Sequence, residues 1–119
     1  MSNEIKLPRP VAQYVETVNA GDVEGFLWAF AEDAVVEDVN RTIRGADAIA
    51  KWARREIFGV EARLEVMKLA ASRDRTVVTV KIDGSFDRKG LPDPLLMDHA
   101  FVIAEGRISR LEIAFTEAT

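Results

Sequence analysis

The sequence lacks cysteine altogether and contains a single histidine, His99, among its 119 residues. Without cysteine the chain can form neither a disulfide framework nor a thiolate metal site. With one histidine, a site in which several histidines hold a metal ion is excluded as well. We therefore expect no resident metal ion.

Positively charged residues are also fewer than negatively charged residues. The chain has 16 Lys and Arg residues against 20 Asp and Glu residues, which gives a formal net charge of −4. Nucleic acids and anionic membranes are bound mainly through clustered positive charge, so we expect neither as a partner. No stretch approaches the roughly 20 apolar residues of a membrane span. Residues 1–10 lack the apolar core of a signal peptide, so the expected location is cytoplasmic.

Repeats, linkers and low-complexity tracts are absent too, so we expect one domain over residues 1–119. Hydrophobic residues make up 48% of the chain and charged residues 30%, as in an ordinary globular domain with a hydrophobic core.

Helical patterns come first and strand patterns follow. Pro8 and Pro10 open a helix that ends at residues 19–21, and Asp22 caps a second helix. The other expected elements are a strand over 34–39, a helix over 46–58, and strands over 61–71, 76–86, 95–104 and 107–115. Three helices followed by an antiparallel meander predict an α+β fold with the helices on one face of the sheet.

The strand over 95–104 is apolar on both faces. Alternation places one set on one side and the other set on the opposite side: Leu96, Asp98, Ala100 and Val102 against Leu95, Met97, His99, Phe101 and Ile103. Neither side shows the polar pattern of a solvated face, so we expect a second copy of the chain to cover the outer one. The prediction is a homodimer with His99, Phe101 or Ile103 near the contact.

Three acid groups stand in apolar patterns. Tyr14 lies within the first helix, Asp38 ends the strand over 34–39, and Asp98 interrupts the apolar run over 95–103. An ionised carboxylate buried in such a run costs several kcal/mol unless it is paired, so we expect Asp98 to keep its proton. A phenol, a neutral carboxylic acid and an ionised carboxylate in one apolar pocket would form a proton-transfer site.

Each of these residues also has a purely structural interpretation. Tyr14 could be a core aromatic with its hydroxyl at the rim, and Asp38 could be a solvated strand end. Asp98 could form a buried ion pair instead. The candidate partners for that pair are Arg44, Arg54 and Arg55.

The sequence resembles the Δ5-3-ketosteroid isomerases of the NTF2-like, or SnoaL-like, superfamily over nearly its whole length. The segments that carry the resemblance are Tyr14-Val-Glu-Thr-Val-Asn-Ala-Gly-Asp22, Phe30-Ala-Glu-Asp-Ala34, Val36-Glu-Asp38 and Asp98–Phe115. The specific part is the joint spacing of Tyr14, Asp38 and Asp98. In the isomerases, a well-known example of pKa tuning, the matching residues are the oxyanion-hole tyrosine, the general base and a protonated aspartic acid.

The chain departs from the isomerase pattern at two positions. Val39 follows the expected base where the family often has proline, and Ala53 stands where some isomerases have a further tyrosine that supports the oxyanion hole. The support around Tyr14 is therefore thinner than in those enzymes.

The resemblance implies a strongly curved, mostly antiparallel sheet with three N-terminal helices, which encloses an apolar pocket in an NTF2-like cone. It also implies a steroid Δ-isomerase that needs no cofactor. Asp38 would move a proton so that a β,γ double bond becomes conjugated with a 3-keto group, while Tyr14 and neutral Asp98 donate hydrogen bonds to the dienolate oxygen.

The expected ligand is a hydrophobic, steroid-like small molecule. The candidate pocket walls are Val18, Phe30, Trp52, Val80, Phe86, Leu111 and Phe115. The superfamily also suggests a polyketide cyclase or a non-catalytic module that binds hydrophobic small molecules. Convergence of Tyr14, Asp38 and Asp98 on one cavity would favour the isomerase.

Overall fold

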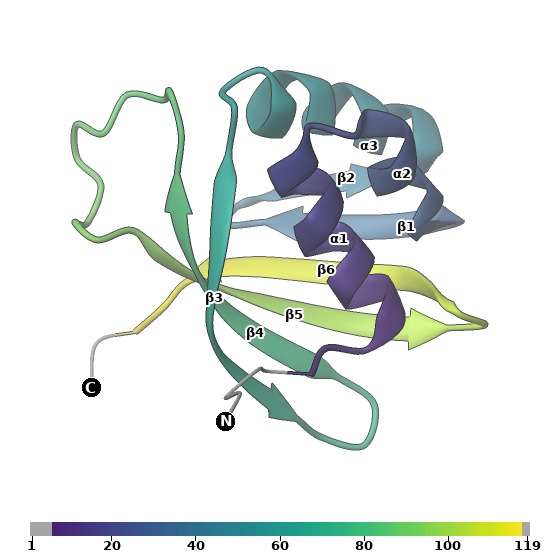
Figure 1. Ribbon diagram of the computed structural model, residues 1–119. Helices are drawn as coiled ribbons and strands as arrows, with labels where there is room; N and C mark the ends of the chain where they lie inside the picture. Colours follow the sequence, from purple (N-terminus) through teal and green to yellow (C-terminus); the bar gives the residue numbers. More distant parts are fainter. Residues whose placement is uncertain (1–5, 118–119) are drawn as a thin grey trace.

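The computed structural model describes residues 6–117 (Figure 1). In chain order its elements are α1 (Arg9–Ala20), α2 (Val23–Trp28), β1 (Phe30–Asp38), β2 (Arg41–Arg44), α3 (Ala46–Ala53), the π-helical turn η1 (Arg54–Phe58), β3 (Arg63–Ala71), β4 (Thr76–Asp83), β5 (Leu96–Ala104) and β6 (Arg107–Phe115). No helix within residues 6–117 is long and apolar enough to cross a membrane. The expectation that residues 1–10 hold no signal peptide falls partly outside the described residues.

The six strands form one curved sheet in the order β2-β1-β6-β5-β4-β3. All neighbouring strands are antiparallel except β1 and β6, which are parallel. The helices lie on the concave side of this sheet, with α1 across its middle and α3 at the end formed by β1 and β2 (Figure 1). The predicted α+β class, with helices on one face of a mostly antiparallel sheet, is confirmed.

The helix ends follow the signals in the sequence. Pro8 precedes the first turn of α1, and Gly21 ends the helix in the left-handed region at φ 70°. Glycine adopts that conformation without the steric penalty of a side chain. The Asp22 side chain then accepts a hydrogen bond of 3.0 Å from the backbone N–H of Gly25, which caps α2 as expected.

Two elements that lie near the end of β1, the strand β2 and the turn η1, differ from the prediction. Strand β2 was not expected, because its four residues are mostly polar and show no alternation. It pairs with β1 through a turn at Val39, whose φ is 58°. The third helix also changes form at Arg54, where η1 continues it with π-helical geometry. Such π segments are frequent at functional sites.

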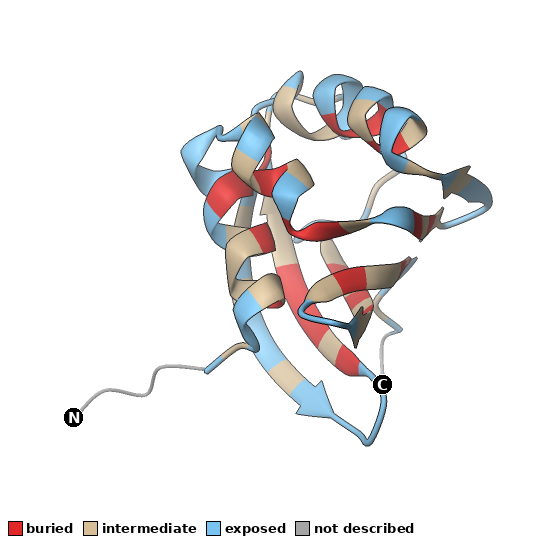
Figure 2. Cartoon of the chain, turned by 90° about the vertical axis from the view of Figure 1, so that its right-hand side faces the viewer, coloured by how far each residue is buried: buried red, intermediate tan, exposed pale blue. Residues whose placement is uncertain are grey.

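The core lies between the helices and the concave face. Figure 2 shows the buried residues in red on the inner strands and on the helix sides that meet them. The largest fully buried side chains include Val11, Val18, Phe26, Ile49, Val78, Val80, Phe101, Ile108 and Leu111.

The outer face is more polar than expected. Arg110 on this face forms ion pairs with Glu37 and Glu112, and all three side chains are partly exposed. His99 and Phe101 belong to the inner face and are only 3% and 1% exposed. The prediction that they lie near a dimer contact on the outer face is therefore wrong, because alternation along β5 turns them into the core.

Candidate active site

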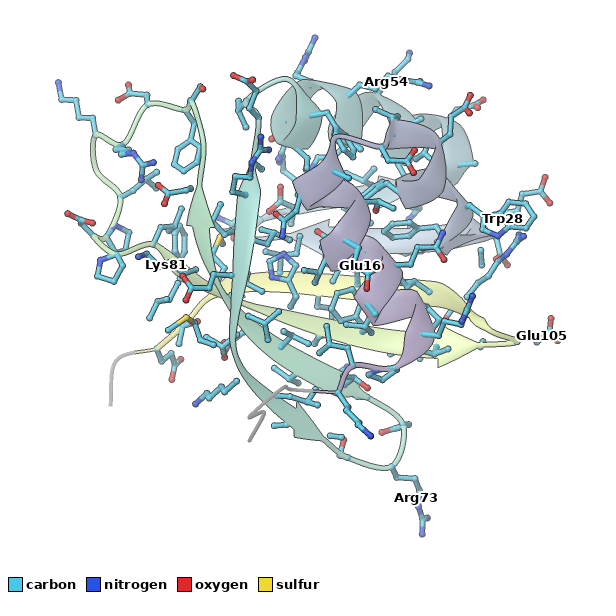
Figure 3. The ribbon with its side chains drawn as sticks, in the orientation of Figure 1. Glu16, Trp28, Arg54, Arg73, Lys81 and Glu105 are labelled. Atoms are coloured by element: carbon cyan, nitrogen blue, oxygen red, sulfur yellow. The ribbon has the colours of Figure 1, made fainter. Side chains whose placement is uncertain are left out.

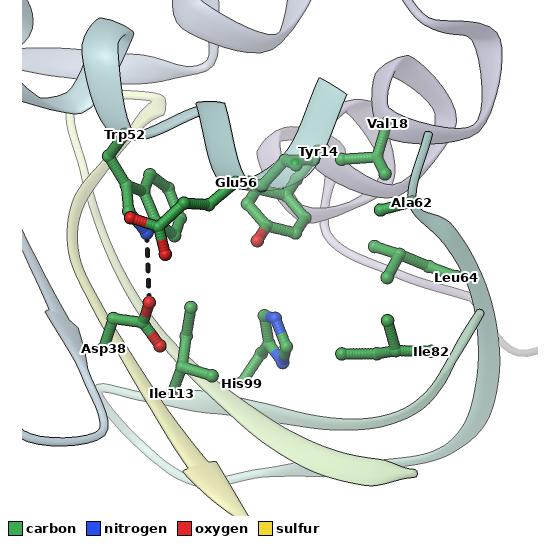
Figure 4. A pocket seen from close by; sticks show the side chains of 11 residues that line it. Tyr14, Val18, Asp38, Trp52, Glu56, Ala62, Leu64, Ile82, His99 and Ile113 are labelled. Carbon is green, nitrogen blue, oxygen red and sulfur yellow. Dashed lines mark hydrogen bonds between the residues drawn. The ribbon is translucent and has the colours of Figure 1, made fainter. Parts of the chain in front are cut away.

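A cavity of about 120 Å³ lies between the concave face of the sheet and the helices (Figure 4). Its lining residues are Tyr14, Val18, Asp38, Trp52, Glu56, Ile57, Ala62, Leu64, Ile82, His99 and Ile113. Most of these are apolar, and the polar groups come from five separate elements: α1, β1, α3, η1 and β5. Such a pocket, apolar with a few converging polar groups, is the usual form of a small-molecule site.

Tyr14 projects into the cavity from α1. The residue is 2% exposed, and its ring packs against Phe26 and Phe101, with centroid separations of 5.0 and 5.2 Å. None of the hydrogen bonds described for residues 6–117 uses its hydroxyl, which faces the cavity in Figure 4. Burial, and then the nearby charge of Asp38, raises the pKa of Tyr14 well above its ordinary value. The phenol therefore keeps its proton and can donate it in a hydrogen bond to a ligand.

Asp38 reaches the cavity from the end of β1. Its Oδ2 accepts a hydrogen bond of 3.0 Å from Trp52 Nε1, which is the dashed line in Figure 4, and one of 2.7 Å from Arg41 Nη2. Both bonds use Oδ2, so Oδ1 has no hydrogen-bond partner among residues 6–117. The carboxylate is thus oriented through one oxygen while the other can accept a proton.

Arg41 links Asp38 to Glu56. Its guanidinium donates two hydrogen bonds to Glu56, of 2.7 and 2.6 Å, in addition to its bond with Asp38. The hydrogen bond from Arg41 is the main cause that lowers the pKa of Glu56. The bond with Glu56 is in turn the main cause that raises the pKa of Arg41. One cation therefore fixes two carboxylates at the edge of the cavity.

His99 also lines the cavity, which the sequence interpretation missed. It lies on the inner face of β5, where Val78 and Ile113 are its neighbours in the sheet, and its ring centroid is 5.7 Å from that of Tyr14. Nδ1 is buried and has no hydrogen-bond partner in the part of the chain that the structure describes. Burial is the main cause that lowers the pKa of His99 to about 4, so the imidazole is neutral near pH 7.

Asp98 lies outside the cavity, on the outer face of β5. Its Oδ1 accepts hydrogen bonds from the hydroxyls of Thr79, at 2.6 Å, and Thr116, at 2.8 Å. The prediction that it converges with Tyr14 and Asp38 is wrong, because successive residues of a strand point to opposite faces and His99 takes the inner one. None of the salt bridges described for residues 6–117 includes Asp98, so the alternative pairing with an arginine is not observed either.

The predicted pocket walls are only partly correct. Val18 and Trp52 line the cavity, whereas Phe30, Val80 and Leu111 are buried elsewhere in the core. Phe86 packs against the guanidinium of Arg88, and Phe115 is 43% exposed. The apolar walls that the prediction missed are Ile57, Ala62, Leu64, Ile82 and Ile113. Within residues 6–117, no cluster of three or more His, Asp or Glu side chains could hold a metal ion.

Comparison with known proteins identifies a family and several solved structures with a similar fold. The family model of the SnoaL-like domain matches residues 11–111. The crystal structure of a candidate polyketide cyclase from Sinorhizobium meliloti is 30% identical, with a TM-score of 0.81, over 91% of this chain and 95% of that chain. No curated protein matches the sequence.

Two further similar structures share the fold at lower identity. One is a Δ5-3-ketosteroid isomerase from Mycobacterium sp., 19% identical, with a TM-score of 0.72, over 91% of each chain. The other is a Mycobacterium tuberculosis protein in complex with estradiol-17β-hemisuccinate, 16% identical, with a TM-score of 0.74, over 91% of this chain and 92% of that chain.

Proposed function

The chain belongs to the SnoaL-like domain family, and we propose that its cavity is an active site that removes a proton from carbon next to a carbonyl group. The observation that carries this proposal is the presence of the Tyr14 hydroxyl and the Asp38 carboxylate in one largely apolar cavity. A base and a hydrogen-bond donor are the two groups that enolisation of a ketone requires.

Asp38 acts as the base in this proposal. Its Oδ1 takes a proton from the carbon, and the electron pair of the broken C–H bond moves into the new C=C bond of an enolate, whose charge rests on the former carbonyl oxygen. Trp52 and Arg41 hold Oδ2 during this transfer. A positioned general base typically contributes about 10²–10⁴-fold to the rate.

Tyr14 stabilises the enolate oxygen through its hydroxyl. The raised pKa of Tyr14 keeps the proton on the phenol, so that the residue donates a hydrogen bond and does not ionise. His99 supplies a second polar group near the same point, as a neutral imidazole 5.7 Å from the Tyr14 ring, centroid to centroid. It occupies the role that the isomerase resemblance gave to Asp98, a donor beside Tyr14.

The cavity limits what can react there. An apolar cavity of about 150 Å³ binds benzene, and this cavity, at about 120 Å³, is somewhat smaller, so it holds one ring at most. The proposed substrate is therefore a hydrophobic small molecule whose carbonyl-bearing ring or chain end enters the cavity while the rest stays at the mouth. The estradiol derivative bound by one similar protein supports a ligand of this general kind.

Two complete reactions share this enolisation step. In steroid Δ-isomerisation, Asp38 returns the proton to the γ-carbon and the double bond becomes conjugated. The spacing of Tyr14 and Asp38 supports this form, and the position of Asp98 outside the cavity speaks against it. In polyketide cyclisation, the enolate carbon attacks a second carbonyl carbon of the same molecule and forms a C–C bond. The π bond of that carbonyl breaks, and the resulting alkoxide takes the proton from Asp38. The 30% identical relative, which is described as a candidate polyketide cyclase, favours this form.

The test is exchange of α-hydrogen for deuterium in small cyclic ketones, followed by NMR in heavy water. Exchange reports enolisation without requiring the natural substrate. We expect the protein to accelerate exchange and Tyr14→Phe to reduce the acceleration by roughly 10²–10³-fold, as for loss of one oxyanion donor. Ligand binding without any acceleration would instead identify a non-catalytic binding module.

A further inference from the structure

A second hollow lies directly beside the cavity, on the surface formed by α3 and η1. Its volume is about 690 Å³, and it is lined by Lys51, Trp52, Arg54, Arg55 and Glu56. We call this hollow the basic groove. Trp52 and Glu56 line both the basic groove and the cavity, so these two side chains stand between the two spaces.

The basic groove concentrates positive charge, although the chain as a whole carries a net negative charge. Lys51, Arg54 and Arg55 are exposed, and none of them belongs to a salt bridge described for residues 6–117. Positions three and four apart lie on the same side of a helix, where like charges repel one another. Figure 3 shows Arg54 on the outer side of the helix, away from the sheet. Three adjacent cations in a chain of net charge −4 are therefore open to an anion.

Glu56, the one carboxylate of the groove, is already engaged. It accepts two hydrogen bonds from Arg41, of 2.6 and 2.7 Å. It forms no ion pair with the three cations among residues 6–117, although the nearby charge of Arg55 helps to lower its pKa after the hydrogen bond from Arg41. One carboxylate therefore faces three cations, and their positive charge is only partly balanced within the groove. An anionic group of a ligand would meet one competing carboxylate there, and that carboxylate is hydrogen-bonded to Arg41.

We propose that the substrate carries an anionic oxygen group, a carboxylate or a phosphate, that binds in the basic groove while its carbonyl end lies in the cavity. This inference rests on the proposed function, because it takes the cavity as the place of the reacting end. The cavity holds one ring at most, so a larger substrate that extends past Trp52 and Glu56 reaches the groove. The planar fork of Arg55, whose charge acts on Glu56 at the border of the cavity, suits both carboxylate and phosphate oxygens.

The experiment compares three matched phenols, because a phenol mimics an enolate and can fill the cavity. They are 3-(4-hydroxyphenyl)propanoate, its uncharged primary amide, and 2-(4-hydroxyphenyl)ethyl phosphate. Their affinities are measured by calorimetry at low and high ionic strength, where the screening lengths are about 30 and 3 Å. We expect one or both anions to bind roughly 10-fold more tightly than the amide at low ionic strength, and this gap to close at high ionic strength.

Two triple variants locate the effect. Lys51→Gln, Arg54→Gln and Arg55→Gln together should reduce the gap between anion and amide to less than about 2-fold and leave the affinity for the amide unchanged. The control combines Lys68→Gln, Arg73→Gln and Lys89→Gln, which remove the same charge from exposed positions outside both hollows, and it should keep the gap.

Each outcome either supports or overturns the basic groove as an anion site. A gap for the carboxylate alone, or for the phosphate alone, supports the proposal and identifies the anion. Equal affinity of all three phenols, a gap that survives in the groove variant, or a gap that persists at high ionic strength overturns the basic groove as an anion site and leaves the cavity proposal standing. Failure of all three phenols to bind overturns both proposals.

Discussion

Trp52 holds Asp38 in the cavity through a hydrogen bond of 3.0 Å from the indole Nε1 to Oδ2. The bond joins α3 to the end of β1 and fixes the carboxylate whose other oxygen is the proposed base. Trp52 is 6% exposed, and so is shielded from solvent that could replace this bond. The orientation of Asp38 therefore depends on a residue 14 positions further along the chain.

Replacement of that donor tests the orientation of the base. Trp52→Phe keeps an aromatic ring but removes the N–H group, and a hydrogen bond to a charged group contributes about 1.5–3 kcal/mol. We expect α-deuterium exchange to slow by roughly 10-fold or more. The matched control is Trp28→Phe, since Trp28 is 66% exposed and lies outside the cavity. Equal rates in the two variants would show that Trp52 does not position Asp38.

Asp98 should be dispensable for the reaction. Its carboxylate is bonded to Thr79 and Thr116 on the outer face, so Asp98→Asn should change the exchange rate by less than about 2-fold. The measurement is the same NMR assay at saturating ketone. A loss of 10-fold or more in this variant would show that Asp98 takes part in the reaction and contradict its exclusion from the site.

His99 should make the stability depend on pH. Its pKa is lowered to about 4 in the folded protein from 6.5, so the unfolded chain binds the proton more tightly. Stability is therefore complete above about pH 6.5 and falls as the pH drops towards 4, by an amount on the order of 3 kcal/mol. Urea unfolding across this range should show a smaller loss in His99→Phe than in the wild type, because the carboxylates are common to both proteins. Parallel curves for the two proteins would contradict a buried neutral imidazole.

A homodimer through the outer face of the sheet stays a prediction. The partly exposed apolar residues on that face are Val77, Leu96, Ala100 and Val102. Apolar surface of this kind often marks an interface. Light scattering at micromolar concentration should give the mass of two chains, and Ala100→Arg should give the mass of one. A wild-type protein with the mass of a single chain would remove the dimer from the account.

The order and class of the elements could be predicted because each has a local signal. The glycine at position 21 and the aspartate at position 22 fix the end of one helix and the start of the next, and strand β6 was predicted at its observed bounds. Strand β2 lacked such a signal, since its polar residues are ordered by pairing with β1. Elements with a local sequence signal were therefore predicted, whereas an element that is ordered by pairing with another strand was not.

The site was predicted less completely, because its composition depends on tertiary structure. Alternation shows that Asp98 and His99 point to opposite faces of the sheet. The position of Asp98 within an apolar run was nevertheless interpreted as evidence that Asp98 lines the pocket. The large apolar residues Met97 and Phe101 lie on the same face of β5 as His99, and both are buried. These neighbours were the better indication of which face lines the pocket. Curvature of the sheet also moves the cavity along the strands, so that Ile82 lines it and Val80 does not.

The link between Arg41 and Glu56 was also beyond sequence reasoning. Fifteen residues separate the two side chains, and they meet only because β2 and η1 come together at the edge of the cavity. No local pattern indicates such a pair. The pair nevertheless holds Glu56, which lines both the cavity and the basic groove.

The measurement that tests the central claim most directly is α-deuterium exchange in Asp38→Asn, alongside binding of a phenol to the same variant. The amide keeps the shape of the carboxylate but cannot take a proton, so we expect exchange to fall by roughly 10²–10⁴-fold while the phenol still binds in the cavity. Exchange at the wild-type rate in Asp38→Asn would contradict the assignment of Asp38 as the base.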